Sequence, residues 1–119
     1  MQYALLIYES AAHRAVRQAG GPEQEKVHAA YVAFTDALVA AGVMRGGEAL
    51  DLPDFATTLS AGPDGQPTIQ DGPFADTKEQ LGGFFVIEVE HLDEAIRWAS
   101  RCPALAGGKV EIRPTTQPG

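Results

Sequence analysis

Near the start of the chain stands Tyr3-Ala4-Leu5-Leu6-Ile7-Tyr8, and Phe84-Phe85-Val86-Ile87-Glu88-Val89 stands in its second half. Both runs are short and almost wholly apolar, which is typical of strands that are buried on both faces. We therefore expect these two segments to be the central strands of a sheet.

Two helices are expected beside these strands. The first begins at Pro22, because proline presets φ at the first helical position, and Gly42 ends it as a left-handed cap. Its apolar residues recur at spacings of three and four, as a helix that lays one face on a sheet requires; they are Val27, Tyr31, Phe34, Leu38 and Ala41. The second helix spans about 92–102 and stops at Pro103. Between the first strand and the first helix, residues 9–21 form a polar, alanine-rich connection with room for one helical turn.

Four further extended segments complete the pattern. Residues 43–52 contain Gly46-Gly47, which indicates a bulge or a close backbone approach. Segments 56–60 and 67–70 flank Gly62-Pro63-Asp64-Gly65 and form a peripheral hairpin, and 109–113 form a last, one-sided strand. The order predicts an α+β fold, a ferredoxin-like βαβ-βαβ sandwich with an inserted hairpin. We expect a single domain over residues 1–114 and a flexible tail over 115–119.

This architecture predicts a dimer. In a ferredoxin-like sandwich both helices cover the same face of the sheet, yet the two central strands are apolar on both faces. Apolar surface left in water costs about 25 cal/mol per Å², and the sequence offers no third helix of useful length to cover the second face. A second copy of the sheet is the simplest cover, giving a homodimeric α+β barrel with an interface of roughly 1,600 Å². The alternative is a monomer whose hairpin folds under the sheet.

Composition excludes several classes of partner. The net charge is −7 and the pI about 4.8, without a basic patch, so nucleic acid is not an expected partner. No apolar run approaches the ~18 residues of a membrane span and no basic signal-peptide start is present, so we expect a cytoplasmic protein. Cys102 is the one cysteine, and the three histidines share no ligand spacing. Neither a metal nor a cofactor is expected, since Gly82-Gly83 lacks a phosphate-loop context.

Several residues are candidates for a site. Asp71 precedes Gly72-Pro73, where its carboxylate can act as a base or ligand contact, or accept hydrogen bonds from its own turn. His28 lies beside the apolar row of the first helix and can exchange protons with Asp71 or Tyr31, or be a half-exposed surface histidine. Lys78 can bind a carboxylate or be solvated. We assign the candidate roles as catalytic for His28 and Asp71, and ligand-binding for Tyr8, Tyr31, Phe74 and Lys78.

The segment Asp71-Gly72-Pro73-Phe74, followed by residues 75–84, resembles the YCII-related family, specifically its DGPF subgroup. The likeness extends to the opening strand and to the segments 40–48, 92–103 and 110–114. It implies a ferredoxin-like dimer. Family members outside the subgroup carry a histidine on the first helix with an acidic partner, and Tyr31 stands at that position here. Many members lie beside genes for extracytoplasmic-function sigma factors, which implies a regulatory role as much as an enzymatic one.

The sequence therefore leaves function open between two main hypotheses. The first is a small dimeric domain that binds a small organic molecule in a cleft between the first helix, the sheet and residues 71–80, with acid–base chemistry as an option. The second is an interaction module that modulates an extracytoplasmic-function sigma factor, and a third is a structural protein without a ligand. Whether the protein is an enzyme is not determined by the sequence.

Overall fold

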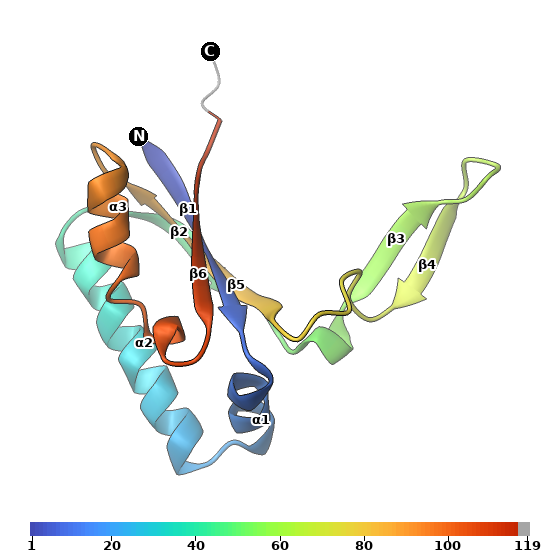
Figure 1. Ribbon diagram of the computed structural model, residues 1–119, viewed down its shortest axis with the longest axis horizontal. Coiled ribbons are helices and arrows are strands. Elements are labelled where there is room, and N and C mark those ends of the chain that lie inside the picture. Colours follow the sequence, from blue (N-terminus) through green and yellow to red (C-terminus); the bar gives the residue numbers. More distant parts are fainter. Residues whose placement is uncertain (117–119) are drawn as a thin grey trace.

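The computed structural model describes residues 1–116 and shows a four-stranded sheet, three helices and a separate two-stranded hairpin (Figure 1). The main sheet consists of β1 (Gln2–Glu9), β2 (Met44–Ala49), β5 (Gln80–Glu88) and β6 (Lys109–Pro114). The hairpin consists of β3 (Thr57–Ala61) and β4 (Pro67–Asp71). The helices are α1 (Ala11–Ala19), α2 (Pro22–Ala40) and α3 (Leu92–Ala99), with short 3-10 turns η1 (Pro53–Phe55) and η2 (Pro103–Leu105).

The main sheet has the order β2-β5-β1-β6, and each neighbouring pair is antiparallel. The two apolar runs are its central strands β1 and β5, as predicted. The α+β class is confirmed, and the strand order is compatible with a ferredoxin-like sandwich. The assembly of two such sheets into a barrel stays a prediction.

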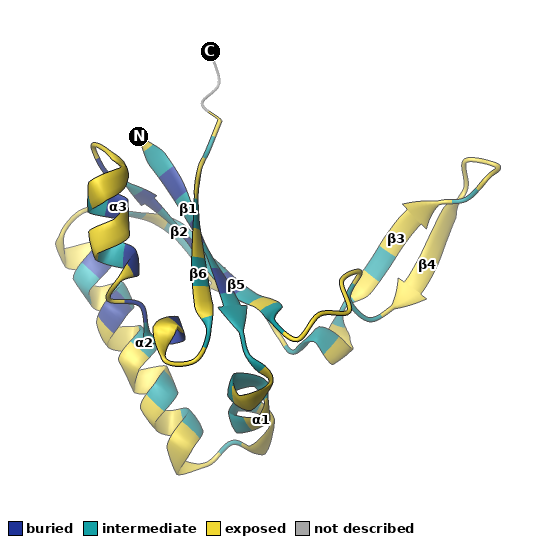
Figure 2. Ribbon diagram, in the orientation of Figure 1, coloured by how far each residue is buried: buried dark blue, intermediate teal, exposed yellow. Residues whose placement is uncertain are grey.

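One face of the sheet forms the core with α2 and α3 (Figure 2). Side chains alternate between the two faces of a strand, so every second residue of β1 and β5 points toward the helices. Leu5, Ile87 and Leu38 of α2 are fully buried there, and the ring of Phe34 meets Phe85 edge-on at 5.2 Å between centroids. The core therefore lies on one side of the sheet only.

The end of α2 and the start of β2 follow the predicted glycines. Gly42 has a φ of 73°, its N–H donates to the carbonyl of Val39, and the N–H of Val43 donates to that of Leu38. This pair of bonds is a Schellman motif, which satisfies carbonyls that the helix leaves open. In β2 the register shifts between Met44 and Gly46, and a Cβ on Gly47 would lie 2.7 Å from the carbonyl oxygen of Phe84. The expected bulge and the close backbone approach are both present.

Helix α1 is longer than the single turn predicted for residues 9–21. None of its nine residues is buried, and polar contacts hold it in place. The hydroxyl of Ser10 accepts a hydrogen bond from the N–H of His13, at 3.2 Å. Arg17 donates to the carboxylate of Glu9 and to the carbonyl of Leu50. Because the helix lacks an apolar core face, apolar periodicity could not reveal its length.

The opposite face of the sheet carries a second apolar surface, which we call the open plate. The register pairs Leu6 with Phe84, Ala4 with Val86 and Tyr8 with Leu81 on neighbouring strands. Five of these side chains point away from the helices because they alternate with the buried ones. Leu81 joins them because the register shifts between Ile7 and Tyr8, which pairs Leu81 with Tyr8. No helix within residues 1–116 packs on this face, so the six residues are only half-buried or exposed.

The β3–β4 hairpin, which we call the arm, projects away from the body (Figure 1). Its strands pair with each other and form a sheet of their own. The alternative of a monomer with the hairpin folded under the main sheet is therefore not what the structure shows. At the other end of the chain, the N–H of Thr115 donates to the carbonyl of Gln2 at 2.9 Å, and residues 117–119 of the expected tail lie outside the described residues.

Candidate functional site

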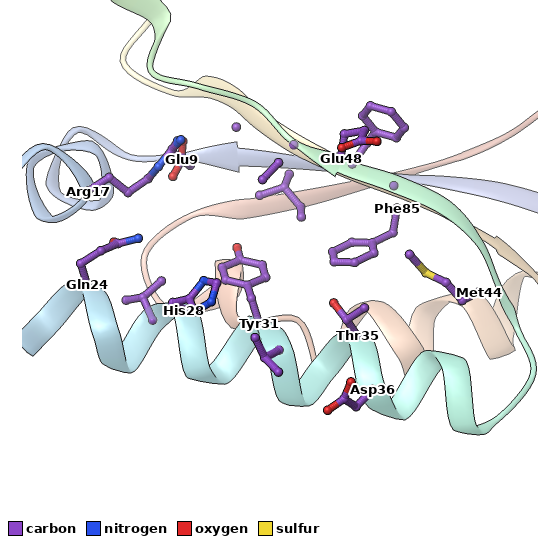
Figure 3. Close-up of a pocket in the computed structure, with 18 residues that line it drawn as sticks. Glu9, Arg17, Gln24, His28, Tyr31, Thr35, Asp36, Met44, Glu48 and Phe85 are labelled. Carbon is purple, nitrogen blue, oxygen red and sulfur yellow. The ribbon is translucent and has the colours of Figure 1, made fainter. Parts of the chain in front are cut away.

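A pocket of about 480 Å³ opens between α2 and the β2–β5 side of the sheet (Figure 3). Its walls come from β1, α1, α2, β2 and the start of β5. The residues that line it are Ile7, Glu9, Arg17, Gln24, Val27, His28, Tyr31, Val32, Thr35, Asp36, Met44, Gly47, Glu48, Ala49, Gly82, Gly83, Phe84 and Phe85. Gly47, Gly82 and Gly83 form part of the sheet wall, where neighbouring atoms leave little room for a side chain.

The end of the pocket nearest α1 is polar. The half-buried ion pair between Arg17 and Glu9 lies here, and Arg17 also donates to the carbonyl of Leu50. The side chain of Gln24 extends toward the cavity from the first turn of α2 (Figure 3). Its Oε1 atom is buried and has no hydrogen-bond partner among residues 1–116, which leaves an unsatisfied acceptor at this end.

Tyr31 sits in the middle of α2 with its hydroxyl directed into the pocket (Figure 3). Burial raises the pKa of Tyr31 far above its usual range, and the neighbouring thiol of Cys102 and carboxylate of Glu9 act in the same direction. Burial likewise raises the pKa of Cys102. Both groups are therefore neutral at pH 7, so Tyr31 serves as a hydrogen-bonding hydroxyl and Cys102 is not a thiolate nucleophile.

The remaining walls combine an apolar lining with two further polar groups. Phe85 and Met44 present apolar surface to the cavity, while Thr35 directs its hydroxyl toward it (Figure 3). His28 is exposed and lies at the pocket one turn before Tyr31. Histidine is the residue type that exchanges protons near neutral pH. The site can therefore bind a partly apolar molecule and offer it a proton carrier.

The candidate residues from the sequence analysis lie in different parts of the structure. His28 and Tyr31 line the pocket together. Asp71 ends β4 on the arm, and Phe74 and Lys78 lie in the exposed segment that follows. None of these three lines the pocket in a single chain, so the third wall of the cleft is α1 rather than residues 71–80.

Tyr8 lies on the other face of the sheet, at a shallow hollow that it shares with Glu79, Lys109, Val110 and Glu111. The ammonium of Lys109 bridges both carboxylate oxygens of Glu79, at 2.7 and 2.8 Å. This bridge ties the end of the 71–80 segment to β6. Tyr8 and the end of that segment are therefore neighbours on the side away from the pocket.

Sequence reasoning missed the polar end of the pocket. Glu9, Arg17 and Gln24 come from three different elements around the 9–21 connection, whose helix was not foreseen. One signal was present: Arg17 and Glu9 are opposite charges flanking an alanine-rich stretch that favours a helix.

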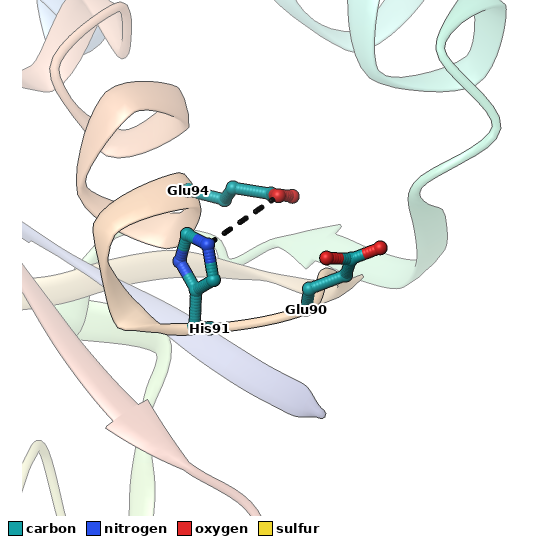
Figure 4. A group of neighbouring side chains, drawn as sticks. All are labelled: Glu90, His91 and Glu94. Atoms are coloured by element: carbon teal, nitrogen blue, oxygen red, sulfur yellow. Dashed lines mark ion pairs between the residues drawn. The ribbon is translucent and has the colours of Figure 1, made fainter.

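A group of possible metal ligands stands apart from the pocket. Donor atoms of Glu90, His91 and Glu94 lie within 4.8 Å of one another at the start of α3, and the ring of His91 is 3.8 Å from the carboxylate of Glu94 (Figure 4). Glu90 and His91 are exposed. Acidic residues in the first turn of a helix stabilise the positive end of its dipole, which accounts for Glu94 without a metal.

Comparison with known proteins identifies the family. Residues 1–117 match the YCII-related domain. The chain belongs to the YCII-related family. A YCII-related domain thus accounts for nearly the whole length of the chain, and the resemblance carried by residues 71–84 pointed to the correct family.

A relative supports the same assignment. The uncharacterized protein R00369 of Rhizobium meliloti (strain 1021) is 35% identical over 117 residues, covering 96% of this chain and 91% of that protein. Within residues 1–116 of this YCII-related domain, every helix is too short or too polar to cross a membrane. In the pocket, Tyr31 and His28 lie one turn apart on α2.

Proposed function

We propose that this chain is a cytoplasmic, homodimeric member of the DGPF subgroup that binds a small organic molecule in the pocket beside α2. The pocket itself is the observation that carries the proposal. Its volume of about 480 Å³ lies within the range of small-molecule sites, and it combines an apolar lining with a few convergent polar groups. A purely structural role without a ligand would not account for a cavity of this size.

Acid–base chemistry at the site centres on His28. It is the lining residue whose type changes charge near neutral pH. Tyr31, held neutral by burial, would orient the ligand through its hydroxyl. The acidic residues that line the pocket with His28 are Glu9, Asp36 and Glu48. An acidic partner of the kind that the family resemblance implies would come from these, because the arm holds Asp71 away from the pocket.

The homodimer is supported by the open plate. Leu6, Phe84 and Val86 lie together on a face that no element of residues 1–116 covers. Stacking two such faces about 10 Å apart would remove this apolar surface from water. Sedimentation velocity should then show a dimer at micromolar concentration. Val86→Glu should yield a folded monomer, because each copy would bury an unpaired carboxylate in the apolar interface.

A thermal-shift screen against a metabolite library tests the pocket. A ligand that binds only the folded state raises the melting temperature. Thr35→Trp fills the pocket and should abolish the shift, whereas Ala33→Trp, on an exposed position of the same helix outside the pocket, should preserve it. Hits that shift both variants equally would place the ligand elsewhere, and a complete lack of hits would exclude the binding function.

His28→Gln separates binding from chemistry. For a confirmed ligand that is transformed, the variant should retain binding but lose turnover and its pH dependence, with His91→Gln as a control outside the pocket. Equal turnover in His28→Gln and the unsubstituted protein would remove His28 from the mechanism.

The second candidate is an interaction module for an extracytoplasmic-function sigma factor. The exposed apolar side chains of the arm favour it, because isolated apolar surface of this kind often marks a protein contact. It would be preferred if the screen yields no ligand and the purified protein is a monomer. Direct titration with a purified sigma factor of that class would then measure the association.

A further inference from the structure

The arm has one apolar face and one polar face, and no other part of residues 1–116 covers the apolar face. The register pairs Leu59 with Ile69 and Thr57 with Asp71, and alternation places all four on one face with Ala61 and Pro67. The other face is polar; it carries Thr58, Ser60, Thr68 and Gln70. Leu59 and Ile69 are 61% and 68% exposed, although they face the same way. One face of the arm therefore has the apolar pattern of a sheet face that packs against a second layer.

An isolated two-stranded hairpin is marginally stable in water at best. The arm nevertheless keeps five registered residue pairs, and within residues 1–116 its strands lie apart from the main sheet. Phe55 and Phe74 at its base are exposed too. Cover for the arm must therefore come from outside the chain.

Stacked open plates alone fall short of the roughly 1,600 Å² interface expected from the sequence, because the flat face of one plate is small. Four strands about 4.8 Å apart, each contributing about six residues, give a flat face of roughly 400 Å². A standard interface buries about 800 Å² on each partner. A stable dimer thus needs additional surface next to the plate, and the arm, which joins β2 to β5, continues from that side of the sheet.

Charge indicates where the arm would lie. Residues 46–77, which include the arm, contain six acidic residues and no Lys or Arg. The opposite edge of the sheet, β6, carries Lys109 and Arg113 on the same face as the open plate, opposite Tyr8 and Ala4 in the register. Glu111 lies between them on that face, and the two cations pair with Glu79 and Glu111, so this edge is close to neutral and repels an acidic arm less than the rest of the acidic chain does. In a dimer whose two-fold axis runs parallel to the strands, the β2–β5 side of one sheet faces β6 of the other.

We propose that the arm of each copy clasps a second copy of this chain, packing its Leu59–Ile69 face along the β6 edge of the partner's open plate. The clasp rests on the homodimer of the proposed function. It brings Asp71, which shares the face of Ile69, to the β6 edge of the partner, where the side chains of Lys109 and Arg113 are exposed. There Asp71 and Phe74 of one chain meet the hollow beside Tyr8 of the other, on the sheet face away from the pocket of His28 and Tyr31. Lys78 stays near β6 of its own chain, because the neighbouring Glu79 pairs with Lys109.

A pair of double variants tests the clasp. Leu59→Asp with Ile69→Asp alters the apolar face, and Ser60→Asp with Thr68→Asp places the same charges on the neighbouring pair of the polar face. Sedimentation equilibrium should show that the first double variant weakens the dimer by at least ~30-fold and the second by less than ~3-fold. Circular dichroism of both should match the unsubstituted protein, because the body does not depend on the arm.

Hydrogen exchange supplies a second measurement that requires no variant. Arm amides should exchange more slowly at concentrations where the dimer forms than at dilutions where it dissociates.

Equal weakening by both double variants, or exchange of the arm that is independent of concentration, would overturn the clasp. If Val86→Glu dissociates the dimer while both arm variants leave it intact, the plate dimer stands and the clasp fails. If the unsubstituted protein is a monomer throughout, the proposed dimer fails as well.

Discussion

The body and the arm use the same kinds of residue to different ends. In the body, alternate residues of β1 and β5 meet two helices, and Leu5, Leu38 and Ile87 are fully buried. In the arm, one face also carries apolar residues, but Leu59 and Ile69 remain exposed. The strand pattern is therefore complete in both regions, and only the body possesses its covering layer. The unfolding free energy of the protomer should therefore come from the body. The arm should instead contribute to the free energy of association with the chain that covers it.

The largest contrast is expected from truncating one leucine in each region. Leu38→Ala empties a fully buried position and should cost about 2–5 kcal/mol of unfolding free energy. Leu59→Ala should cost less than about 0.5 kcal/mol in the monomer, because the side chain loses no packing. Urea unfolding in the monomeric Val86→Glu background measures both. Similar costs would mean that the arm packs on its own body in solution.

Backbone proximity gives the next contrast. Gly47→Ala places a methyl group 2.7 Å from the carbonyl oxygen of Phe84 and should destabilise the body by roughly 1–3 kcal/mol. Gly46→Ala is its matched control, since a Cβ there meets no atom within 4 Å. Urea midpoints of the two variants should differ clearly. A tolerated Gly47→Ala would show that β2 is as loosely held as the arm.

A pH effect is expected from the body alone. Tyr31 and Cys102 have raised pKa values in the folded state, so their protonated forms stabilise the fold below the unfolded values. The unfolded chain loses protons that the folded chain retains above about pH 9 for Cys102 and above about pH 10 for Tyr31. Once a group titrates in the unfolded chain, stability should fall by up to roughly 1.4 kcal/mol per pH unit for that group. Urea unfolding at about pH 7, 9, 10 and 11 should show this decline. It should flatten in Cys102→Ala with Tyr31→Phe, and an unchanged slope would assign the decline to other groups.

The smallest effect should follow removal of the arm. Replacing residues 57–71 by a short Gly-Ser loop exchanges one loop closure for another, which changes unfolding free energy by about 0.5 kcal/mol or less. The near-ultraviolet spectrum and urea slope of the monomeric background should be preserved. A large loss would show that the body and the arm form one cooperative unit.

Much of the body was predictable because apolar periodicity and glycine positions act locally. The strands at residues 3–8 and 84–89, the start of α2 at Pro22 and its end at Gly42 all follow from neighbouring residues. Helix α1 was underestimated because His13 and Arg17 hold it through polar contacts with Ala106 and Leu50, which are distant along the chain. Such contacts leave no periodic signal.

The site was predictable only where a single element forms it. His28 and Tyr31 share a face of α2, so helical spacing places both at the pocket. Glu9 and Gln24 join them through the path of α1, which the sequence did not reveal. Asp71 and Lys78 could not be placed, because the direction in which a hairpin leaves its sheet depends on what covers the hairpin.

The packing of Tyr31 against Cys102 gives the protein an internal reporter. The chain has one thiol, and it is buried beside η2 and neutral at ordinary pH. A maleimide or disulfide reagent would therefore label it only when η2 separates from α2. The rate of labelling therefore measures how often the packing between η2 and α2 opens, and no engineered probe is needed. A bound ligand should slow that rate.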